Sequence, residues 1–281
     1  MRLHAIAPAK LNLSLYLTGK RADGYHLLDS LVAFTQFGDE LSLSPADDLS
    51  LEVTGEYAGQ VPVADNLILK AVALVRAHYD VVAGAQVLLH KHIPVGAGLG
   101  GGSSDAAMAT MLVCKLWDIP YDAAMIGQLL APLGADMAAC ITRKPLWMRG
   151  VGEVIEPAQG VPDYAVLLVN PRVVLPTPDV YGALQPEEIG RAYPQAEEDM
   201  AAYILQARND LQAAAIRLCP VIDEVLGALA RETHCVVARQ SGSGATCFAL
   251  FDKKEAALEA ASVIANAYPT WWVMPTQLLG T

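Results

Sequence analysis

The chain lacks any excess of positive charge: its 281 residues carry 30 acidic and 19 basic side chains, for a formal net charge of −11. No basic stripe offsets this charge, which argues against nucleic acid as a partner. An uninterrupted apolar run of about 18 residues is also missing, as is a signal-peptide core near the N-terminus. We therefore expect a soluble cytoplasmic protein that contacts no membrane.

Paired cysteines are missing as well. The five cysteines are an odd number, lie far apart in the sequence and form no C-x-x-C motif. This usage fits free, buried thiols in a reducing compartment better than a disulfide framework or a zinc site. Repeats and low-complexity tracts are absent, and 53% of the residues are hydrophobic against 17% charged. The chain can therefore bury a substantial core and is not disordered.

Strand and helix patterns mix along the chain without the regular βαβ order of a doubly wound sheet. Alternating apolar and polar residues predict strands at residues 11–17, 27–35, 41–44 and 49–53. Strands are also predicted at residues 87–93, 146–155, 164–170 and 271–274, with a strand pair around 241–246. Helical patterns cover residues 65–76, 105–117, 121–133, 196–231 with a break at Pro220, and 254–267. This mixture favours an α+β fold.

Three prolines in residues 171–178 mark an irregular linker between the two halves of the chain. We expect an N-terminal domain of residues 1–160 and a C-terminal domain of residues 161–281. A length of 281 residues suits two domains of ordinary size.

The most informative stretch is residues 94–107, Pro-Val-Gly-Ala-Gly-Leu-Gly-Gly-Gly-Ser-Ser-Asp-Ala-Ala, with five glycines within seven positions. Glycine lets backbone N–H groups turn inward and lets an anion approach closely. The helix that follows adds unpaired N–H groups and its positive dipole end. We predict a phosphate cradle, with Ser103 and Ser104 placed to reach a phosphate or its metal ion. The alternative is a tight connection without a ligand.

This stretch differs from two known phosphate-binding motifs. The P-loop pattern G-x-x-x-x-G-K-[ST] is absent, and Gly96-x-Gly98-x-x-Gly101 matches the dinucleotide fingerprint only weakly. The preceding residues 90–94 are polar for a buried parallel strand. The candidate acid, Asp118, ends a helix rather than a second strand. We therefore set the dinucleotide interpretation aside.

Two segments near the N-terminus carry polar residues at positions that indicate a functional role. Lys10 and Asn12 share the face opposite the leucines of residues 11–17, where the alternative is an ordinary solvated face. Residues 19–26 form a glycine-bounded turn that ends in Tyr25 and His26, which can stack and form hydrogen bonds. The alternative for this turn is a plain hairpin tip.

Two acids lie at predicted helix starts. Asp136 follows Gly-Ala at a loop-to-helix junction, where a capping role is the alternative to a chemical one. Asp105 is interpreted as an acid of the first helical turn rather than as a catalyst.

Taken together, these segments resemble the GHMP kinases nearly from end to end. The matching runs are residues 8–13, 19–26, 65–68, 94–107, 133–136, 177–181, 209–211 and 241–248. Among them, Gly-Leu-Gly-Gly-Gly-Ser-Ser-Asp-Ala-Ala is the specific signal of the family. The resemblance implies a two-domain fold, with an N-terminal ribosomal-protein-S5-like α/β domain, a C-terminal ferredoxin-like α+β domain and an active site in the cleft between them.

The Gly-Tyr-His turn separates the relevant branch of this family from its mevalonate and homoserine kinases. The resemblance implies ATP-dependent phosphorylation of the 2-hydroxyl on the methylerythritol part of a cytidine diphosphate conjugate, in the non-mevalonate route to isoprenoid precursors, with Mg²⁺. Asp136 is then the general base, and Lys10 is the cation that lowers the pKa of the hydroxyl and stabilises developing charge. An ammonium beside a carboxylate keeps that acid ionised and ready as a base. A monomer or weak homodimer is expected.

The same resemblance implies the binding residues. ATP phosphates would contact Pro94, Val95, Gly96, Ala97, Gly98, Leu99, Gly100, Gly101, Gly102, Ser103 and Ser104, with Ser104 near the metal. Asn12 would orient the sugar alcohol, Tyr25 and Tyr181 would sandwich the cytosine, and His26 would form hydrogen bonds to its edge. Thr177 and the second glycine loop, with Gly242 and Gly244, would close over the phosphates or the substrate.

The sequence departs from the family at three places. Met137-Ala138-Ala139 follows the acid where Val-Pro and a bulky residue are usual, residues 142–145 replace a glycine pair, and Gln240 stands where an apolar residue is usual. Two other functions stay open: a GHMP kinase for homoserine or a mevalonate-type acid, and a nucleotide-binding regulator without activity. The aromatic residues argue against the first, and retention of both Lys10 and Asp136 argues against the second.

Overall fold

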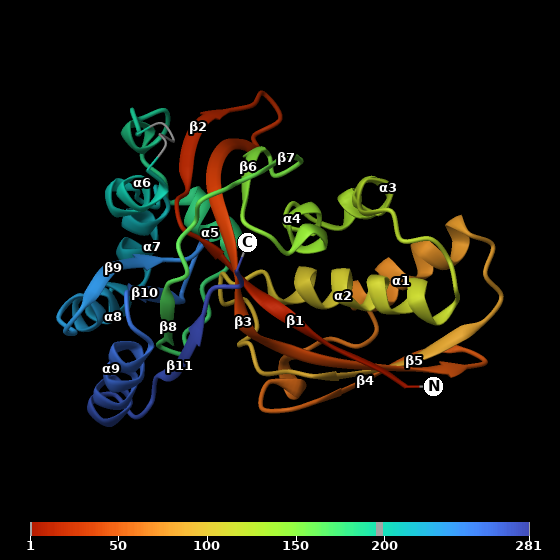
Figure 1. The fold of residues 1–281 in the computed structure, drawn as a ribbon. Coiled ribbons are helices and arrows are strands. Elements are labelled where there is room, and N and C mark those ends of the chain that lie inside the picture. The colour runs from red at the N-terminus through yellow and green to blue at the C-terminus, as the bar shows by residue number, and fades with distance from the viewer. Residues whose placement is uncertain (1, 195–198, 281) are drawn as a thin grey trace. The chain divides into compact units, whose positions relative to one another are not determined.

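The computed structural model describes residues 2–194 and 199–280 and has the α+β architecture that the sequence predicts (Figure 1). The chain divides into two compact units. Unit 1 comprises Met1–Ala9, Phe37–Val95 and Gly100–Arg143, and unit 2 comprises Lys10–Gln36, Gly96–Leu99 and Lys144–Thr281. The strands β1 (Leu3–Asn12) and β3 (His26–Ala46) each contribute residues to both units. The units are therefore interleaved along the sequence.

Unit 1 combines strands with four helices. The second part of β3 pairs antiparallel with β5 (Gly84–His90), which pairs in parallel with β4 (Leu49–Thr54). Period-two alternation buries every second side chain where β3 pairs with β5, as in Leu41 opposite Leu89 and Leu43 opposite Val87. The helices are α1 (Leu67–His78), α2 (Gly101–Leu116), α3 (Ala123–Leu130) and α4 (Met137–Thr142), with short 3₁₀ turns at Ala58–Gln60 and Ala131–Leu133.

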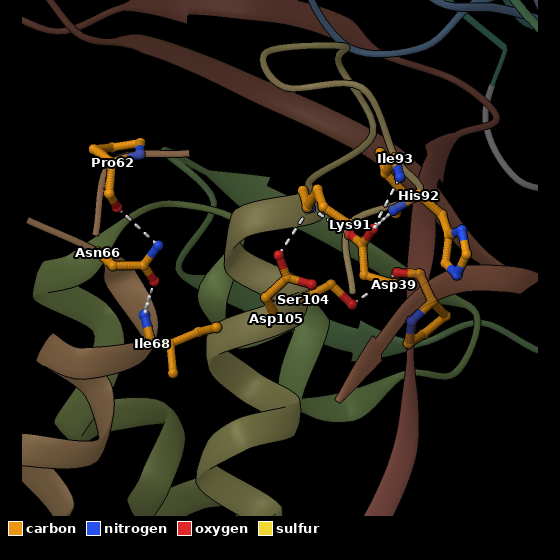
Figure 2. Close-up of polar contacts among 10 residues, drawn as sticks. Asp39, Pro62, Asn66, Ile68, Lys91, His92, Ile93, Ser104 and Asp105 are labelled. Carbon is orange, nitrogen blue, oxygen red and sulfur yellow. Dashed lines mark hydrogen bonds and ion pairs between the residues drawn. The ribbon is translucent and has the colours of Figure 1, made fainter. Parts of the chain in front are cut away.

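The helix predicted at residues 65–76 is confirmed as α1, and its cap explains where it begins. The Asn66 side chain accepts a hydrogen bond from the Ile68 N–H at 2.9 Å and donates to the Pro62 carbonyl at 3.1 Å (Figure 2). An asparagine at this position satisfies one of the N–H groups that a helix start leaves unpaired. Within the described residues, no helix is both long and apolar enough to cross a membrane.

Unit 2 contains a four-stranded antiparallel sheet in the order β11-β8-β10-β9. Its strands are β8 (Ala165–Asn170), β9 (Cys235–Gln240), β10 (Cys247–Phe251) and β11 (Trp272–Gln277). The helices α8 (Val221–Ala230) and α9 (Lys254–Ala267) pack against this sheet. The four strands and the two helices that pack on them follow one another as β8-α8-β9-β10-α9-β11, with α5 to α7 inserted between β8 and α8; this is the βαββαβ arrangement of ferredoxin-like domains. The ferredoxin-like expectation for this part of the chain is confirmed.

The first part of β3 belongs to unit 2, where it pairs with β2 (Tyr16–Lys20) and β6 (Leu146–Gly150), and β6 pairs with β7 (Val154–Pro157). Shorter helices complete this unit: α5 (Thr177–Gly182), α6 (Met200–Gln206), α7 (Gln212–Leu218) and a 3₁₀ turn at Pro186–Glu188. The five cysteines are free thiols, as predicted, but only Cys114, Cys140 and Cys247 are buried, whereas Cys219 and Cys235 are half-buried.

Several element boundaries differ from the sequence prediction. Residues 11–17 are not one strand, because β1 ends at Asn12 and β2 begins at Tyr16. Between them Ser14 Oγ accepts from the Leu31 N–H at 2.9 Å, so a side chain takes the place of a ladder carbonyl. Both faces of this segment are buried, and the solvated-face alternative for Lys10 and Asn12 is wrong.

Four further element boundaries differ from the sequence prediction. Residues 27–35 and 41–44 belong to the single strand β3, whereas 146–155 is split into β6 and β7 by a turn with positive φ at Gly150 and Gly152. Of the helical run expected at residues 196–231, residues 196–198 lie outside the described residues; the described part begins as α6 at Met200 and has a second break, at residues 207–211, in addition to Pro220. The helix expected from Asp105 begins four residues earlier, at Gly101, so Asp105 lies beyond its first turn and the interpretation as a first-turn acid is wrong.

Candidate active site

The glycine-rich stretch has the backbone that a phosphate cradle requires. Gly96, Gly98 and Gly100 have φ of +66°, +76° and +62°, a left-handed conformation that side-chain-bearing residues adopt only with strain. The helix α2 starts directly afterwards, so Ser103 and Ser104 lie in its first turns. The first N–H groups of a helix have no partner within it and attract anions.

The loop residues 97–99 are held by hydrogen bonds to their carbonyl groups within unit 2. The Lys10 N–H donates to the Leu99 carbonyl at 2.8 Å, and the Thr246 N–H donates to the Ala97 carbonyl at 3.2 Å. Ser241 Oγ donates to the Gly98 carbonyl at 3.0 Å. The first glycine loop is therefore attached both to the end of β1 and to the second glycine loop, residues 241–244.

Lys10 and Asn12 form the charged part of this arrangement. Lys10 is 3% exposed, and its Nζ donates to Asn12 Oδ1 at 2.8 Å. The Asn12 amide group donates to Ser30 Oγ at 2.8 Å, and the Asn12 N–H donates to Ser241 Oγ at 3.3 Å. Because both polar atoms of the Asn12 side chain are engaged, the position of this side chain and of the Lys10 ammonium is fixed by the protein itself.

The second glycine loop is fixed by amide side chains. Asn209 Nδ2 donates to the carbonyls of Gln240 and Gly242 at 2.9 and 2.7 Å. Gln240 Nε2 donates to the Gly242 carbonyl at 3.1 Å, and a Cβ on Gly244 would lie 3.1 Å from the Gln240 side chain. The side chain of Gln240 therefore holds the second glycine loop in place. The sequence pattern alone assigns no role to Gln240 or to Asn209, although Asn209 lies in one of the matching runs.

A hydroxyl pair connects this loop to α5. Thr177 Oγ1 and Ser243 Oγ lie 2.8 Å apart. Four residues after Thr177, at the same face of a helical turn, Tyr181 places its ring 5.1 Å from that of His26, at an interplanar angle of 34°. Two of the three predicted base-binding residues are therefore in contact.

Tyr25, the third of these residues, is 66% exposed, and its backbone is fixed by a turn in which its N–H donates to Asp23 Oδ1 at 3.2 Å. Burial lowers the pKa of His26, and the nearby Lys20 ammonium lowers it further. The imidazole is then neutral at pH 7 and offers one donor and one acceptor. The large exposed ring of Tyr25 and the neutral imidazole of His26, the next residue in the sequence, suit a planar heterocycle as their ligand.

The remaining predicted residues lie in unit 1. Asp136 precedes α4 and is half-buried, and its side chain makes no capping hydrogen bond to that helix. The alternative of a purely capping acid is therefore not supported. The Ser104 hydroxyl is buried and donates to the Pro8 carbonyl at 2.7 Å (Figure 2), which leaves its oxygen lone pairs as acceptors.

Two glycines of the first loop provide a matched test of this packing. A Cβ on Gly98 would lie 2.8 Å from the Gly244 carbonyl oxygen, whereas a Cβ on Gly96 would meet nothing within 4 Å. Both positions have positive φ, so alanine is strained at each. We expect Gly96→Ala to lower the free energy of unfolding by about 1 kcal/mol, and Gly98→Ala by about 2–4 kcal/mol because the second loop must also move. Denaturant unfolding measures both, and equal losses would contradict the contact between the loops.

Two family models match the chain. The model for the N-terminal domain of GHMP kinases matches residues 66–144, and the model for the C-terminal domain of GHMP kinases matches residues 191–270. A 4-diphosphocytidyl-2-C-methyl-D-erythritol kinase of Paramagnetospirillum magneticum is 45% identical over 277 residues, which cover 97% of this chain and 97% of that protein.

Solved structures show the same relationship. A crystal structure of 4-(cytidine 5'-diphospho)-2C-methyl-D-erythritol kinase superposes with a TM-score of 0.85 at 32% identity, over 99% of this chain and 100% of that one. A homoserine kinase from Cytophaga hutchinsonii superposes with a TM-score of 0.73 at 15% identity, over 99% and 95% of the two chains. The second similarity concerns the fold alone.

Proposed function

The chain belongs to the GHMP kinases, and on that premise we propose that it transfers the γ-phosphoryl group of ATP to the 2-hydroxyl of 4-diphosphocytidyl-2-C-methyl-D-erythritol. The observation that carries the proposal is the network of Lys10 and Asn12 with both glycine loops, beside the contact between His26 and Tyr181. The two glycine loops with Lys10 suit phosphates, and the contact between His26 and Tyr181 suits a nucleobase. The relatives that share up to 45% of the sequence carry the name of this activity.

The proposed chemistry needs little from the protein beyond position and charge. The substrate hydroxyl gives its proton to the Asp136 carboxylate, its oxygen forms a bond to the γ-phosphorus, and the bond from that phosphorus to the β-phosphate oxygen breaks, which releases ADP. The Lys10 ammonium stabilises negative charge on the attacking oxygen, and Asn12 holds both the ammonium and the sugar alcohol. Buried donors of fixed direction serve this purpose best.

Magnesium is a proposed partner of the phosphates. In nucleotide sites Mg²⁺ takes oxygen ligands, mostly from phosphates, with one or two side chains. The Ser104 hydroxyl fits such a role, since its hydrogen is given to Pro8 and its lone pairs remain. When bound, the ion neutralises charge on the phosphates.

We also propose the domain division at residues 1–160 and 161–281, a cytoplasmic location and a monomer or weak homodimer.

The test is an assay of the purified chain with ATP, Mg²⁺ and the cytidine conjugate, followed by phosphorus NMR. We expect ADP and a new phosphomonoester in equal amounts. Homoserine and mevalonate in place of the conjugate separate this function from those of other family members, because neither has a base for His26 and Tyr181 to contact. Formation of ADP without a phosphorylated product would contradict the proposal, as would equal use of homoserine or mevalonate.

The nucleobase contacts give a second prediction. Tyr25→Ala and Tyr181→Ala should each weaken binding of the conjugate by about 5–150-fold, because base–aromatic stacking is worth roughly 1–3 kcal/mol. The two losses should combine to less than their sum, since both rings contact one base. Calorimetric titrations with the conjugate and with ATP measure the effect, and ATP affinity should stay near that of the wild type.

Tyr268→Ala is the matched control, because Tyr268 also stacks on a ring, Trp271, at a centroid distance of 3.8 Å, but carries no predicted site role. Its conjugate affinity should be unchanged. Methylerythritol phosphate without cytidine should be a poor substrate. If it is phosphorylated as efficiently as the conjugate, the base contacts have no function and the substrate assignment fails.

A further inference from the structure

The segment of residues 207–211 is bound to two different parts of the site within unit 2. It forms the break between α6 and α7, and it includes a run of residues 209–211 that the mechanism does not use. Two neighbouring polar residues of this segment are buried: Asn209 is 5% exposed and Asp210 is 3% exposed. A buried carboxylate is stable only when it is paired and hydrogen-bonded. The partners of these two residues therefore indicate what the segment holds in place.

Asp210 is bound to the start of β2 through both its backbone and its side chain. The Leu15 N–H donates to the Arg208 carbonyl at 2.9 Å, and the Asp210 N–H donates to the Leu15 carbonyl at 2.8 Å. The Leu17 N–H donates to Asp210 Oδ2 at 2.9 Å, and Arg208 Nε donates to Asp210 Oδ1 at 2.6 Å. Each oxygen of the carboxylate therefore accepts from its own donor, and the guanidinium balances its charge.

Leu17 lies at an irregularity in the pairing of β2 with β3. The register shifts between Leu17 and Gly19, so Thr18 is an extra residue on β2. The Leu17 N–H is bonded to Asp210, and the Leu17 carbonyl accepts from the Gly190 N–H at 2.7 Å. A bulge of this kind bends a strand and changes the direction of the side chains beyond it. The backbone at the bulge is therefore held by groups outside the two paired strands.

Beyond the bulge, β2 leads into the turn that carries two of the predicted base-binding residues. Lys20 lies opposite His26, and the Arg21 N–H donates to the Tyr25 carbonyl at 2.7 Å. Because side chains alternate between the two faces of a strand, the extra residue determines the face on which each later residue of β2 lies. Asp210 therefore acts on the position of Tyr25 and His26 through the backbone of β2.

Asn209, the preceding residue, is bound to the other part of the site. Its Nδ2 donates to the carbonyls of Gln240 and Gly242 in the second glycine loop, and its Oδ1 accepts from the Leu211 N–H at 2.9 Å. Both donors of the amide are therefore used. Since Asp210 holds β2 while Asn209 holds the loop, two adjacent residues fix the separation between the base-binding turn and the second glycine loop.

Resting on the function proposed above, we propose that Asp210 is a positioning residue for the nucleobase of the substrate and that Asn209 is the corresponding residue for its phosphates. Through the Leu17 N–H, the Asp210 carboxylate fixes the bulge that orients the turn with Tyr25 and His26. The chain thereby recognises the distance between the base and the phosphates of the conjugate. A ligand that makes no contact with this turn, such as ATP, does not depend on Asp210.

The experiment measures the affinities of Asp210→Asn for the cytidine conjugate and for ATP by calorimetry. Asparagine has the size of the acid but presents one oxygen and one NH₂ group to two donors, so either Leu17 or Arg208 loses its acceptor. We expect the affinity for the conjugate to fall by about tenfold, within the range for the loss of one aromatic contact to a base. The affinity for ATP should change by less than twofold.

The second ligand separates positioning from stability, because loss of folded protein would weaken both ligands by the same factor. Equal losses for the conjugate and ATP would overturn the proposal, as would conjugate affinity within twofold of the wild type. Asp199→Asn is the matched control: Asp199 is an exposed acid of unit 2 that caps α6, with Oδ1 accepting from the Ala202 N–H at 3.0 Å. Asparagine is also a good cap, so neither affinity should change.

A double variant tests whether Asp210 acts through the turn. In Tyr25→Ala the turn has already lost one contact with the base, so adding Asp210→Asn should weaken conjugate binding by less than it does in the wild type. Equal losses in the two backgrounds would show that Asp210 acts elsewhere and would overturn the proposal.

Asn209→Ala should give a different pattern. We expect turnover with the conjugate to fall by about tenfold, because the loop that faces the phosphates loses both bonds from this amide, while conjugate affinity stays within twofold of the wild type. A loss of conjugate affinity as large as that of Asp210→Asn would overturn the division of roles between the two residues.

Arg208→Met serves if Asp210→Asn does not fold. The Arg208 side chain is 29% exposed, and methionine keeps the apolar part of its stem while removing the partner of Asp210 Oδ1. Conjugate affinity should fall by at least about threefold, with ATP affinity within twofold of the wild type. Unchanged conjugate affinity in this variant would overturn the proposal.

The two proposals fail separately, because binding is measured without phosphoryl transfer. A chain that binds the conjugate with the described dependence on Asp210 but does not phosphorylate it would refute the proposed function and leave the positioning role standing. A chain that phosphorylates the conjugate while Asp210→Asn binds it as the wild type does would do the reverse.

Discussion

Asp136→Asn is expected to lower turnover by about 10²–10⁴-fold, the usual contribution of a general base, while the affinity for the cytidine conjugate stays within about threefold of the wild type. The amide has the size of the acid but cannot accept the hydroxyl proton. Steady-state kinetics with the conjugate and ATP give the turnover, and calorimetry gives the affinity. Turnover within threefold of the wild type would remove Asp136 from the mechanism.

A second aspartate of unit 1 separates the chemical from the structural role. Asp122 caps α3, with Oδ1 accepting from the N–H groups of Ala124 and Met125 at 2.9 and 3.1 Å, whereas Asp136 makes no such bond to α4. We expect Asp122→Ala to cost about 1 kcal/mol of unfolding free energy and to leave activity per folded molecule unchanged. Asp136→Ala should show the opposite pattern.

Lys10→Met is expected to lower turnover by about 10²–10³-fold, as the loss of one fixed donor to developing charge does in other enzymes. Methionine preserves most of the volume of the buried stem, but Asn12 Oδ1 loses its donor. The thermal midpoint should therefore fall by a few degrees, because leaving one buried acceptor without a partner costs about 1–3 kcal/mol.

Lys254→Met, an exposed lysine at the start of α9, serves as the control for lost positive charge and should change neither turnover nor midpoint. Turnover of Lys10→Met near that of the wild type, together with a lowered midpoint, would identify Lys10 as a structural residue only.

Most of the architecture could be predicted from periodicity. The α+β class, the helix at 254–267 and the four strands of the unit 2 sheet follow from patterns that burial imposes on local sequence. Boundaries were predicted less well where a side chain replaces the backbone in a hydrogen bond, as Ser14 does between β1 and β2. Such substitutions depend on the partner strand, which lies far away in the sequence.

The same limit applies to the site. Glycine spacing indicated a phosphate loop, but only the structure distinguishes Gly96, Gly98 and Gly100, which have positive φ, from Gly101, which is helical. Contacts over more than two hundred residues, such as the Asn12 N–H with Ser241 Oγ, have no local signature. Asp105 looked like an ordinary helix acid because nothing nearby in the sequence indicates its buried ion pair with Lys91.

The interleaving of the two units has a consequence for the order in which the chain can fold during its synthesis. Every residue of unit 1 has been made once residue 143 is added, so this unit can complete while translation continues. Residues 10–36 are among the first to leave the ribosome, yet their partners come last: the Leu15 N–H donates to the Arg208 carbonyl, and the Phe34 carbonyl accepts from Leu279. Lys10 and Asn12 therefore reach their final surroundings only after nearly the whole chain has been synthesised, and a polypeptide that stops at residue 160 would be without a complete unit 2.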